Sequence, residues 1–102
     1  MKTLGEILKN ARTQKKMILR KVSAKVDIDQ SLISKFEKND RKPTKDQLLR
    51  LAKFYNLPED KLLISWYAEK IAQDLRYTAS TTEILKVAEQ KIEYYKKQKD
   101  EK

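Results

Sequence analysis

An all-α fold is predicted by three properties of the sequence. Only one Gly and two Pro interrupt its 102 residues, whereas Lys, Leu, Glu and Ala, which favour helices, are common. Apolar residues recur at helical spacing along most of the chain. Ser, Thr or Asp, the residues that cap helix starts, precede several of these segments. Together these properties predict six helices joined by short turns.

The first predicted helix starts at Leu4, because Thr3 and Glu6 have the spacing of a capping box, in which each side chain bonds the other residue's amide. Its buried face consists of four residues at helical spacing: Leu4, Ile7, Leu8 and Ala11.

The segment 19–38 predicts two short helices, about 19–26 and 30–38, separated by a tight turn. Asp27 falls where the chain reverses, and Asp tolerates the left-handed conformation. Asp29 is placed to cap the second helix. The residues expected inside are Val22, Val26, Ile28, Ile33 and Phe36. This is the pattern of a helix-turn-helix, whose second helix fits the major groove of DNA.

The outward face of this second helix carries amide, hydroxyl and ammonium groups, which are the groups that read base edges. Four residues are therefore candidate base-reading residues: Gln30, Ser31, Ser34 and Lys35. The structural alternative is that Gln30 and Ser31 merely suit the first turn of a helix. Leu32 belongs either to the core or to an apolar contact with a thymine methyl group.

Three more helices are expected toward the C-terminus. Thr44 and Gln47 form a second capping box for a helix at about 45–55, which ends at Asn56. A long helix at about 58–76 is apolar on more than one face, so only one side of it can dock on the preceding helices. Ser80, followed by Glu83, starts the last helix.

The positive charge is confined to one part of the chain. Residues 1–58 hold 15 basic and 6 acidic side chains, which accounts for the whole net charge of +9, whereas residues 59–102 hold 9 of each. A basic segment next to a neutral one favours a polyanion-binding module joined to a segment with another role.

Composition argues against an enzyme. The chain has no Cys and no His, so the commonest metal ligands and the commonest general base are missing. A single glycine excludes the Gly-rich phosphate-binding loops. We therefore expect no catalytic activity, no metal and no cofactor. The sequence has no apolar run long enough to span a membrane and no secretory leader, so a cytoplasmic location is expected.

Residues 4–63 resemble the lambda-repressor-like, Cro/XRE-type helix-turn-helix domain. The resemblance lies in L-x-x-I-L-K-x-A-R at 4–12, D-Q-S-L-I-S-K-F-E at 29–37 and R-K-P-T-x-x-Q-L-L-R-L-A-K-F at 41–54. It implies a five-helix DNA-binding domain over 1–63, read here with a long fifth helix and an additional sixth helix in a C-terminal extension over 64–102.

The resemblance also implies roles for individual residues. It places base readers at the four residues of the second short helix named above, and a buried ion pair between Arg12 and Glu37. The DNA backbone would be held by Lys38, Asn39, Arg41, Lys42, Thr44 and Lys45.

The sequence departs from the family pattern at three places around the helix at 19–26. Ile18 stands where a Ser or Thr usually caps, Leu19 stands where a Gln usually supports a phosphate contact, and Asp27 replaces the usual Gly of the turn. Contacts to the DNA backbone near the start of this helix are therefore expected from Arg20 or Lys21, or from the amides at the helix end.

The leading hypothesis is a homodimeric transcriptional regulator that binds double-stranded DNA at a palindromic operator, as a phage-type repressor or a restriction–modification controller does. The alternatives are an antitoxin that binds a toxin protein and regulates its own operon, and a helix-turn-helix adaptor that binds protein. The alternative to a dimer is a monomer in which the last helix covers the long one. The expected dimer interface is Trp66, Tyr67, Ile71, Leu75, Leu85, Ala88, Ile92 and Tyr95.

Overall fold

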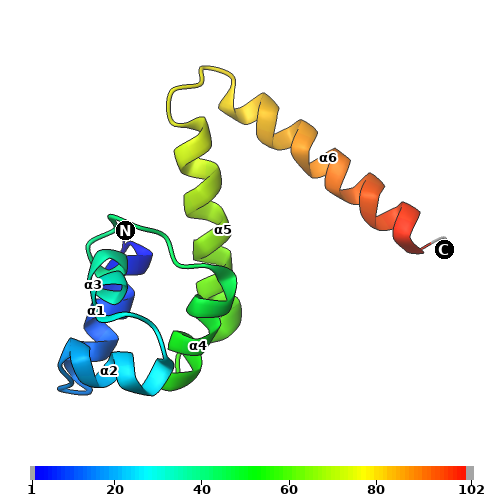
Figure 1. Ribbon diagram of the computed structural model, residues 1–102. Helices are drawn as coiled ribbons and strands as arrows, with labels where there is room; N and C mark the ends of the chain where they lie inside the picture. Colours follow the sequence, from blue (N-terminus) through cyan, green and yellow to red (C-terminus); the bar gives the residue numbers. More distant parts are fainter. Residues whose placement is uncertain (1, 101–102) are drawn as a thin grey trace. The chain divides into compact units, whose positions relative to one another are not determined.

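A computed structural model describes residues 2–100, and that range contains six α-helices and no strand (Figure 1). The helices are α1 (Leu4–Gln14), α2 (Leu19–Val26), α3 (Gln30–Glu37), α4 (Lys45–Tyr55), α5 (Glu59–Leu75) and α6 (Thr81–Asp100). The expected all-helical class is confirmed, and the bounds expected for the helices at 19–26, 30–38, 45–55 and 58–76 agree with these to within one residue at each end. None of the helices in the described range is long and apolar enough to cross a membrane.

The chain divides into two compact units, one ending at Lys70 and the other beginning at Ile71. The first unit contains α1 to α4 and most of α5. The second contains the end of α5 and α6. Each unit is described by itself below.

The core of the first unit lies between α1, α2, α3 and α4. α1 packs against α3 and α4, and α2 packs against the same two helices. The largest fully buried side chains are Leu8, Val22, Ile33, Leu48 and Leu51. Burial of each side chain contributes about 1.5–3 kcal/mol to the stability of the fold, so these five side chains hold the four helices together.

Gly5, the single glycine, allows α1 to approach the end of α3. A Cβ at this position would lie 2.5 Å from the carbonyl oxygen of Phe36 and 2.6 Å from Oδ1 of Asn39. Both are closer than real Cβ atoms come to such atoms, so a larger residue would push α1 away from α3.

The N-terminus of α1 is capped mainly by residues far along the chain. The amide of Glu6 donates to Thr3 Oγ1 (3.2 Å), which is one of the two bonds of the expected capping box; the reciprocal bond from the Thr3 amide to the Glu6 side chain is not formed. The amide of Leu4 donates to Oε2 of Glu69 on α5 (3.0 Å), and that of Gly5 donates to Oδ1 of Asn39 (3.1 Å). Free amides at a helix start are thus satisfied by tertiary contacts, which tie α1 to α5 and to the loop after α3.

The turn between α2 and α3 is built as the sequence predicts. Asp27 has φ 55° and ψ 49°, in the left-handed region, and ends α2. The Ser23 hydroxyl donates to the carbonyl oxygen of Ile28 (2.6 Å), which braces the turn from inside. Asp29 then caps α3 by accepting from the amide of Ser31 (3.1 Å). At the other end of α2, Ile18 provides no side-chain cap.

α4 has both of its expected end signals. Thr44 Oγ1 accepts from the amide of Gln47 (3.1 Å), and the Gln47 side chain accepts from the amide of Thr44 (3.0 Å), so the capping box is complete. Asn56 ends the helix with φ 56°. Because α4 starts directly after the loop that follows α3, this cap fixes where that loop ends.

α5 has two different faces. Leu62 is buried, and Leu63 and Trp66 pack against the core of the first unit. At roughly 100° per residue, Ile64, Tyr67 and Ile71 fall together on another side of the helix, and they are 68%, 49% and 44% exposed. The expectation that one side of this helix docks and another remains uncovered is confirmed for α5 itself.

α6 is amphipathic in the same way. Its apolar residues at helical spacing form one stripe, and its remaining surface is mostly charged. The stripe consists of Ile84, Leu85, Ala88, Ile92 and Tyr95. Four of these are exposed and Ala88 is half-buried.

Candidate nucleic-acid interface

α3 presents a polar outer face on a helix whose inner face is buried. Gln30, Ser31 and Lys35 are exposed and Ser34 is half-buried. Ile33, Phe36 and Glu37 are buried on the other side. The burial of these three inner residues fixes the rotation of the helix, so the four candidate base-reading residues point outward together.

Two shallow grooves flank Gln30. The larger, about 570 Å³, is lined by Leu19, Asp29, Gln30, Ser31, Ser34, Lys35, Lys38 and Asp40. The smaller, about 450 Å³, is lined by Arg12, Ile18, Leu19, Arg20 and Gln30. The structure thus brings the candidate base readers together with residues from the start of α2 and from the loop after α3.

Asp29 shapes the N-terminal end of this face. Its carboxylate accepts from both the hydroxyl and the amide of Ser31. The hydrogen bond from the Ser31 hydroxyl is the main cause of a lowered Asp29 pKa, with smaller help from backbone amides and from the charge of Lys35. Asp29 is therefore ionised at neutral pH, and the Ser31 hydroxyl is oriented toward it, which leaves the hydroxyl oxygen able to accept a hydrogen bond.

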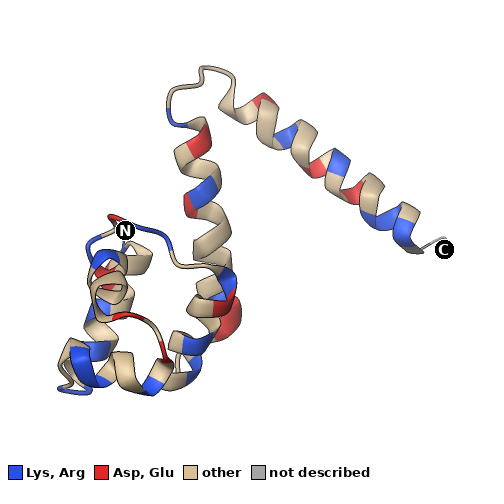
Figure 2. Ribbon diagram, viewed as in Figure 1, with Lys and Arg blue, Asp and Glu red and all other residues tan. Residues whose placement is uncertain are grey.

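Several basic candidates for DNA-backbone contact are exposed to solvent. Arg20 and Lys21 lie in the first turn of α2, and Lys38, Arg41 and Lys45 lie between the end of α3 and the start of α4. Figure 2 shows Lys and Arg spread over α1 to α4 with some acidic residues among them, and both signs of charge on α5 and α6. The exposed Thr44 precedes Lys45, and its hydroxyl oxygen already accepts from the amide of Gln47.

Asn39 and Lys42 differ from the basic candidates for DNA-backbone contact named above, because their polar groups bind other residues of the protein. Asn39, with φ 62°, accepts from the amide of Gly5 and donates to Thr3 Oγ1 (2.9 Å). The Lys42 ammonium donates to the carbonyl oxygen of Trp66 (2.6 Å) and lies 4.3 Å from the centre of its ring. These two residues hold the loop in place from both sides.

Trp66 completes this attachment. Its indole Nε1 donates to the carbonyl oxygen of Pro43 (2.8 Å), and its side chain is half-buried against the first unit. Of the residues expected in a dimer interface, Trp66 therefore lies on the docked side of α5. Leu75 and Ala88 are half-buried, and the exposed ones are Tyr67, Ile71, Leu85, Ile92 and Tyr95.

Arg12 and Glu37 form a bidentate ion pair between α1 and α3. Arg12 Nε lies 2.7 Å from Glu37 Oε2, and Nη2 lies 2.9 Å from Oε1, while Nη1 donates to the carbonyl oxygen of Met17 (3.0 Å). The hydrogen bond to Glu37 is the main reason that the Arg12 pKa is raised. Nearby, burial raises the pKa of Tyr55 to about 12. The pair fixes α3 at the end opposite to its Asp29 cap.

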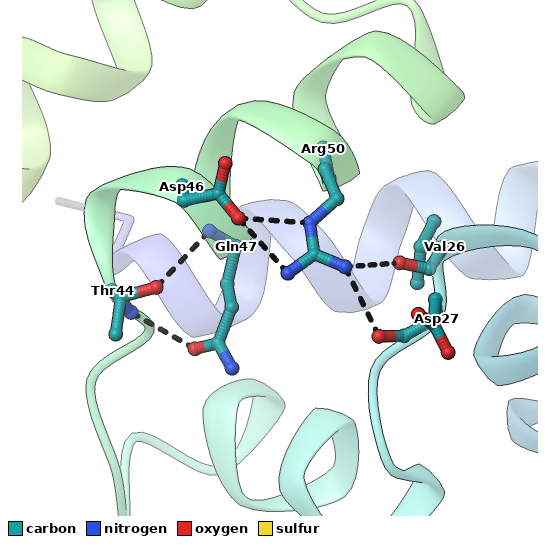
Figure 3. Close-up of polar contacts among 6 residues, drawn as sticks. All are labelled: Val26, Asp27, Thr44, Asp46, Gln47 and Arg50. Atoms are coloured by element: carbon teal, nitrogen blue, oxygen red, sulfur yellow. Dashed lines mark hydrogen bonds and ion pairs between the residues drawn. The ribbon is translucent and has the colours of Figure 1, made fainter.

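Arg50 is a supporting residue that sequence reasoning missed. From α4, its guanidinium donates to the carbonyl oxygens of Val26 (2.9 Å) and Asp27 (3.0 Å), at the turn between α2 and α3 (Figure 3). Asp46, one helical turn before it, accepts from Arg50 Nε (3.1 Å) and orients the group. The i, i+4 spacing of Asp46 and Arg50 predicts their pairing. No sequence signal points to the two carbonyl oxygens.

The comparisons with known proteins bear on this region. The searches of curated proteins and of solved structures gave no match. A family model described as "Helix-turn-helix domain" matches residues 5–65, which includes α2, α3 and α4 in full, most of α1 and the start of α5. The match spans more than half of the chain and includes the two helices and the turn described above, so the chain belongs to the helix-turn-helix domain family.

Proposed function

We propose that the protein is a sequence-specific transcriptional regulator that binds double-stranded DNA with α3 in the major groove. The observation that carries the proposal is the outer face of α3, where amide, hydroxyl and ammonium groups stand together on a helix fixed by a buried inner face. Membership of the helix-turn-helix family supports it, since the second helix of this motif is the recognition helix. The first unit then has the Cro/XRE-type arrangement that its sequence resembles.

In this proposal, α3 reads bases. Gln30 pairs through its amide with adenine, Lys35 donates to guanine, and Ser31, whose hydroxyl already donates to Asp29, accepts from a base. Ser34, which is half-buried, lies at the edge of the same face. Each good bidentate pair contributes about 1–3 kcal/mol of discrimination against a wrong base, so two or three such contacts supply the specificity of one half-site.

The exposed cations beside α3 hold the DNA backbone. Arg20, Lys21, Lys38, Arg41 and Lys45 are solvent-accessible, and the concentration of basic residues in 1–58 supports this role. Thr44 adds a hydroxyl at the start of α4. Asn39 and Lys42 act differently: they position the loop that carries Arg41, because their own polar groups bind Gly5, Thr3 and Trp66.

We further propose that a second copy of the chain covers the exposed stripe of α5. Its residues recur at i, i+3, i+4, i+7 and i+11, the spacing of a helix–helix seam: Ile64, Tyr67, Ala68, Ile71 and Leu75. Residues 59–102 hold equal numbers of acidic and basic side chains, so two copies meet there without net repulsion.

A two-fold dimer makes a direct geometric demand on the DNA. Its two recognition helices face successive major grooves, about 34 Å apart, and the operator is therefore a palindrome. Such a regulator is controlled by its own concentration and self-association, as a repressor or a restriction–modification controller is.

The DNA-binding proposal is tested by selection from a random double-stranded library with the full chain. The expected result is enrichment of one palindromic sequence with half-sites about one helical turn apart. Recovery of DNA without any common sequence would refute sequence-specific binding.

The dimer is tested by sedimentation of the full chain at micromolar concentration. The wild type is expected to be a dimer, and the double variant Ile64→Glu, Ile71→Glu a folded monomer, because both changes place charge in the seam. Gln73→Glu adds one negative charge at an exposed position outside the stripe and should leave the dimer intact. A monomeric wild type would refute the dimer and leave the stripe for a different protein, as in the antitoxin alternative.

A further inference from the structure

Leu19 is an apolar residue set into an otherwise polar recognition surface. It is the first residue of α2 and is half-buried, with its inner part packed against the core. Its remaining surface lines both grooves that flank Gln30. In the larger groove the other lining residues are polar or charged: Asp29, Gln30, Ser31, Ser34, Lys35, Lys38 and Asp40.

A leucine in this place has no polar contact to offer. It cannot donate a hydrogen bond to a phosphate or form one with the side-chain amide of Gln30. Ile18 before it gives no side-chain cap to α2. Leu19 therefore adds an apolar surface to the groove. Removal of this surface from water stabilises a complex when an apolar group packs against it. Among the groups that base pairs present in the major groove, the C5-methyl group of thymine is the apolar one.

We propose that Leu19 is a specificity-determining residue that contacts the methyl group of a thymine beside the base pair read by Gln30. This inference rests on the proposed DNA-binding function, and it assigns to the start of α2 a base contact in addition to those of α3. The preference it creates is for thymine over cytosine, and over any base without the methyl group, at one position in each half-site.

The geometry separates Leu19 from its apolar neighbours. Ile18 is 52% exposed but lines only the smaller groove, away from Ser31, Ser34 and Lys35. Leu32, on α3 itself, packs against the core and lines neither groove. Leu19 alone among the three is shared by both grooves, so it is the one placed beside the bases that α3 reads.

The size of the effect follows from the area of one methyl group. Burial of one such carbon stabilises a complex enough to change an equilibrium constant by about fourfold. Replacement of thymine by deoxyuridine removes this methyl group and leaves every hydrogen-bonding group of the base pair unchanged, so it isolates the contact.

The experiment uses the full chain and duplexes of the selected site in which each thymine is replaced by deoxyuridine in turn. For the wild type, one thymine position in each half-site should be sensitive, and a single replacement there should weaken binding about fourfold. For Leu19→Ala the same replacement should have no effect. Each protein is compared with itself on the two DNAs, so a loss of folded protein in a variant cancels from the ratio.

Ile18→Ala and Leu32→Ala are the matched controls, and both should retain the full deoxyuridine penalty. A wild type that binds the selected site equally well with every deoxyuridine duplex would overturn the inference and leave sequence-specific binding standing. A penalty that survives in Leu19→Ala and disappears in Leu32→Ala would also overturn it, by assigning the contact to α3. A wild type with no preferred site would refute the proposed function itself.

Discussion

Removal of one member of the Arg12–Glu37 pair is expected to destabilise the first unit strongly. The Glu37 side chain is 5% exposed and that of Arg12 is 18% exposed. In Arg12→Ala the carboxylate loses both of its bonds to the guanidinium and remains in a buried position, and the carbonyl oxygen of Met17 loses a donor. Stranding a buried charge in this way costs about 3–5 kcal/mol.

This cost is comparable with the whole stability of the unit. Globular proteins are stable by about 0.05–0.15 kcal/mol per residue, which gives roughly 3–10 kcal/mol for a unit that ends at Lys70. Arg12→Ala should therefore lie at the margin of folding at 25 °C. Glu37→Gln, which keeps an acceptor for the guanidinium but loses the charge, should be less damaging.

Urea unfolding followed by circular dichroism measures these free energies. Asp46→Ala is the matched control, because Asp46 also pairs with an arginine but its side chain is 79% exposed. Loss of such a surface pair should cost at most about 1 kcal/mol. If Arg12→Ala proved as stable as Asp46→Ala, the pair would not be buried in solution and the reasoning would be wrong.

Further outcomes follow from individual contacts. Tyr55→Phe removes a buried hydroxyl that has no hydrogen-bond partner within residues 2–100, and should raise the free energy of unfolding by about 1 kcal/mol in urea titration. The folded pKa of Tyr55 is raised from 10.0 to about 12, so the unfolded chain loses this proton first. The wild type should accordingly lose stability relative to Tyr55→Phe as pH rises through that interval, and parallel titrations that stay level would contradict the shift. Gly5→Ala should lower the melting temperature, by a destabilisation of about 1–3 kcal/mol, because its Cβ would meet Phe36 and Asn39; an unchanged melt would show that α1 moves freely. Arg41→Ala should weaken binding to all DNA and reduce the slope of log K against log salt by roughly 0.9, without changing the melting temperature. Lys42→Ala should instead lower the melting temperature, because its ammonium ties the loop to Trp66; a reversed result for the two variants would mean that their roles are exchanged.

The local structure of the first unit is largely predictable from the sequence. Helical spacing and capping residues give the helices, and the left-handed Asp27 and Asn56 fall where the sequence places them. Arg12 and Glu37, expected to pair, do so with two hydrogen bonds. These features depend on residues a few positions apart, or on a pattern shared by a family.

The contacts between side chains and distant backbone atoms are not predictable in this way. Glu69 and Asn39 accept from amides at the start of α1, and Arg50 donates to carbonyl oxygens at the turn. A bond from a side chain to a distant backbone atom leaves no periodic signal in the sequence. For the same reason the contact between Lys42 and Trp66 is not predictable from the sequence.

Sequence-specific binding by α3 is tested most directly by the ratio of two affinities at one salt concentration. These are the affinities for the selected site and for a scrambled duplex of equal length, measured for the wild type, for Gln30→Ala and for Gln90→Ala, which makes the same change at an exposed position on α6. The wild type and Gln90→Ala should prefer the selected site by about a thousandfold or more. Gln30→Ala should lose about 1–3 kcal/mol on the selected site and nothing on the scrambled one. An unchanged ratio in Gln30→Ala, or a wild type that binds both duplexes equally, would contradict the assignment of α3 as the helix that reads DNA.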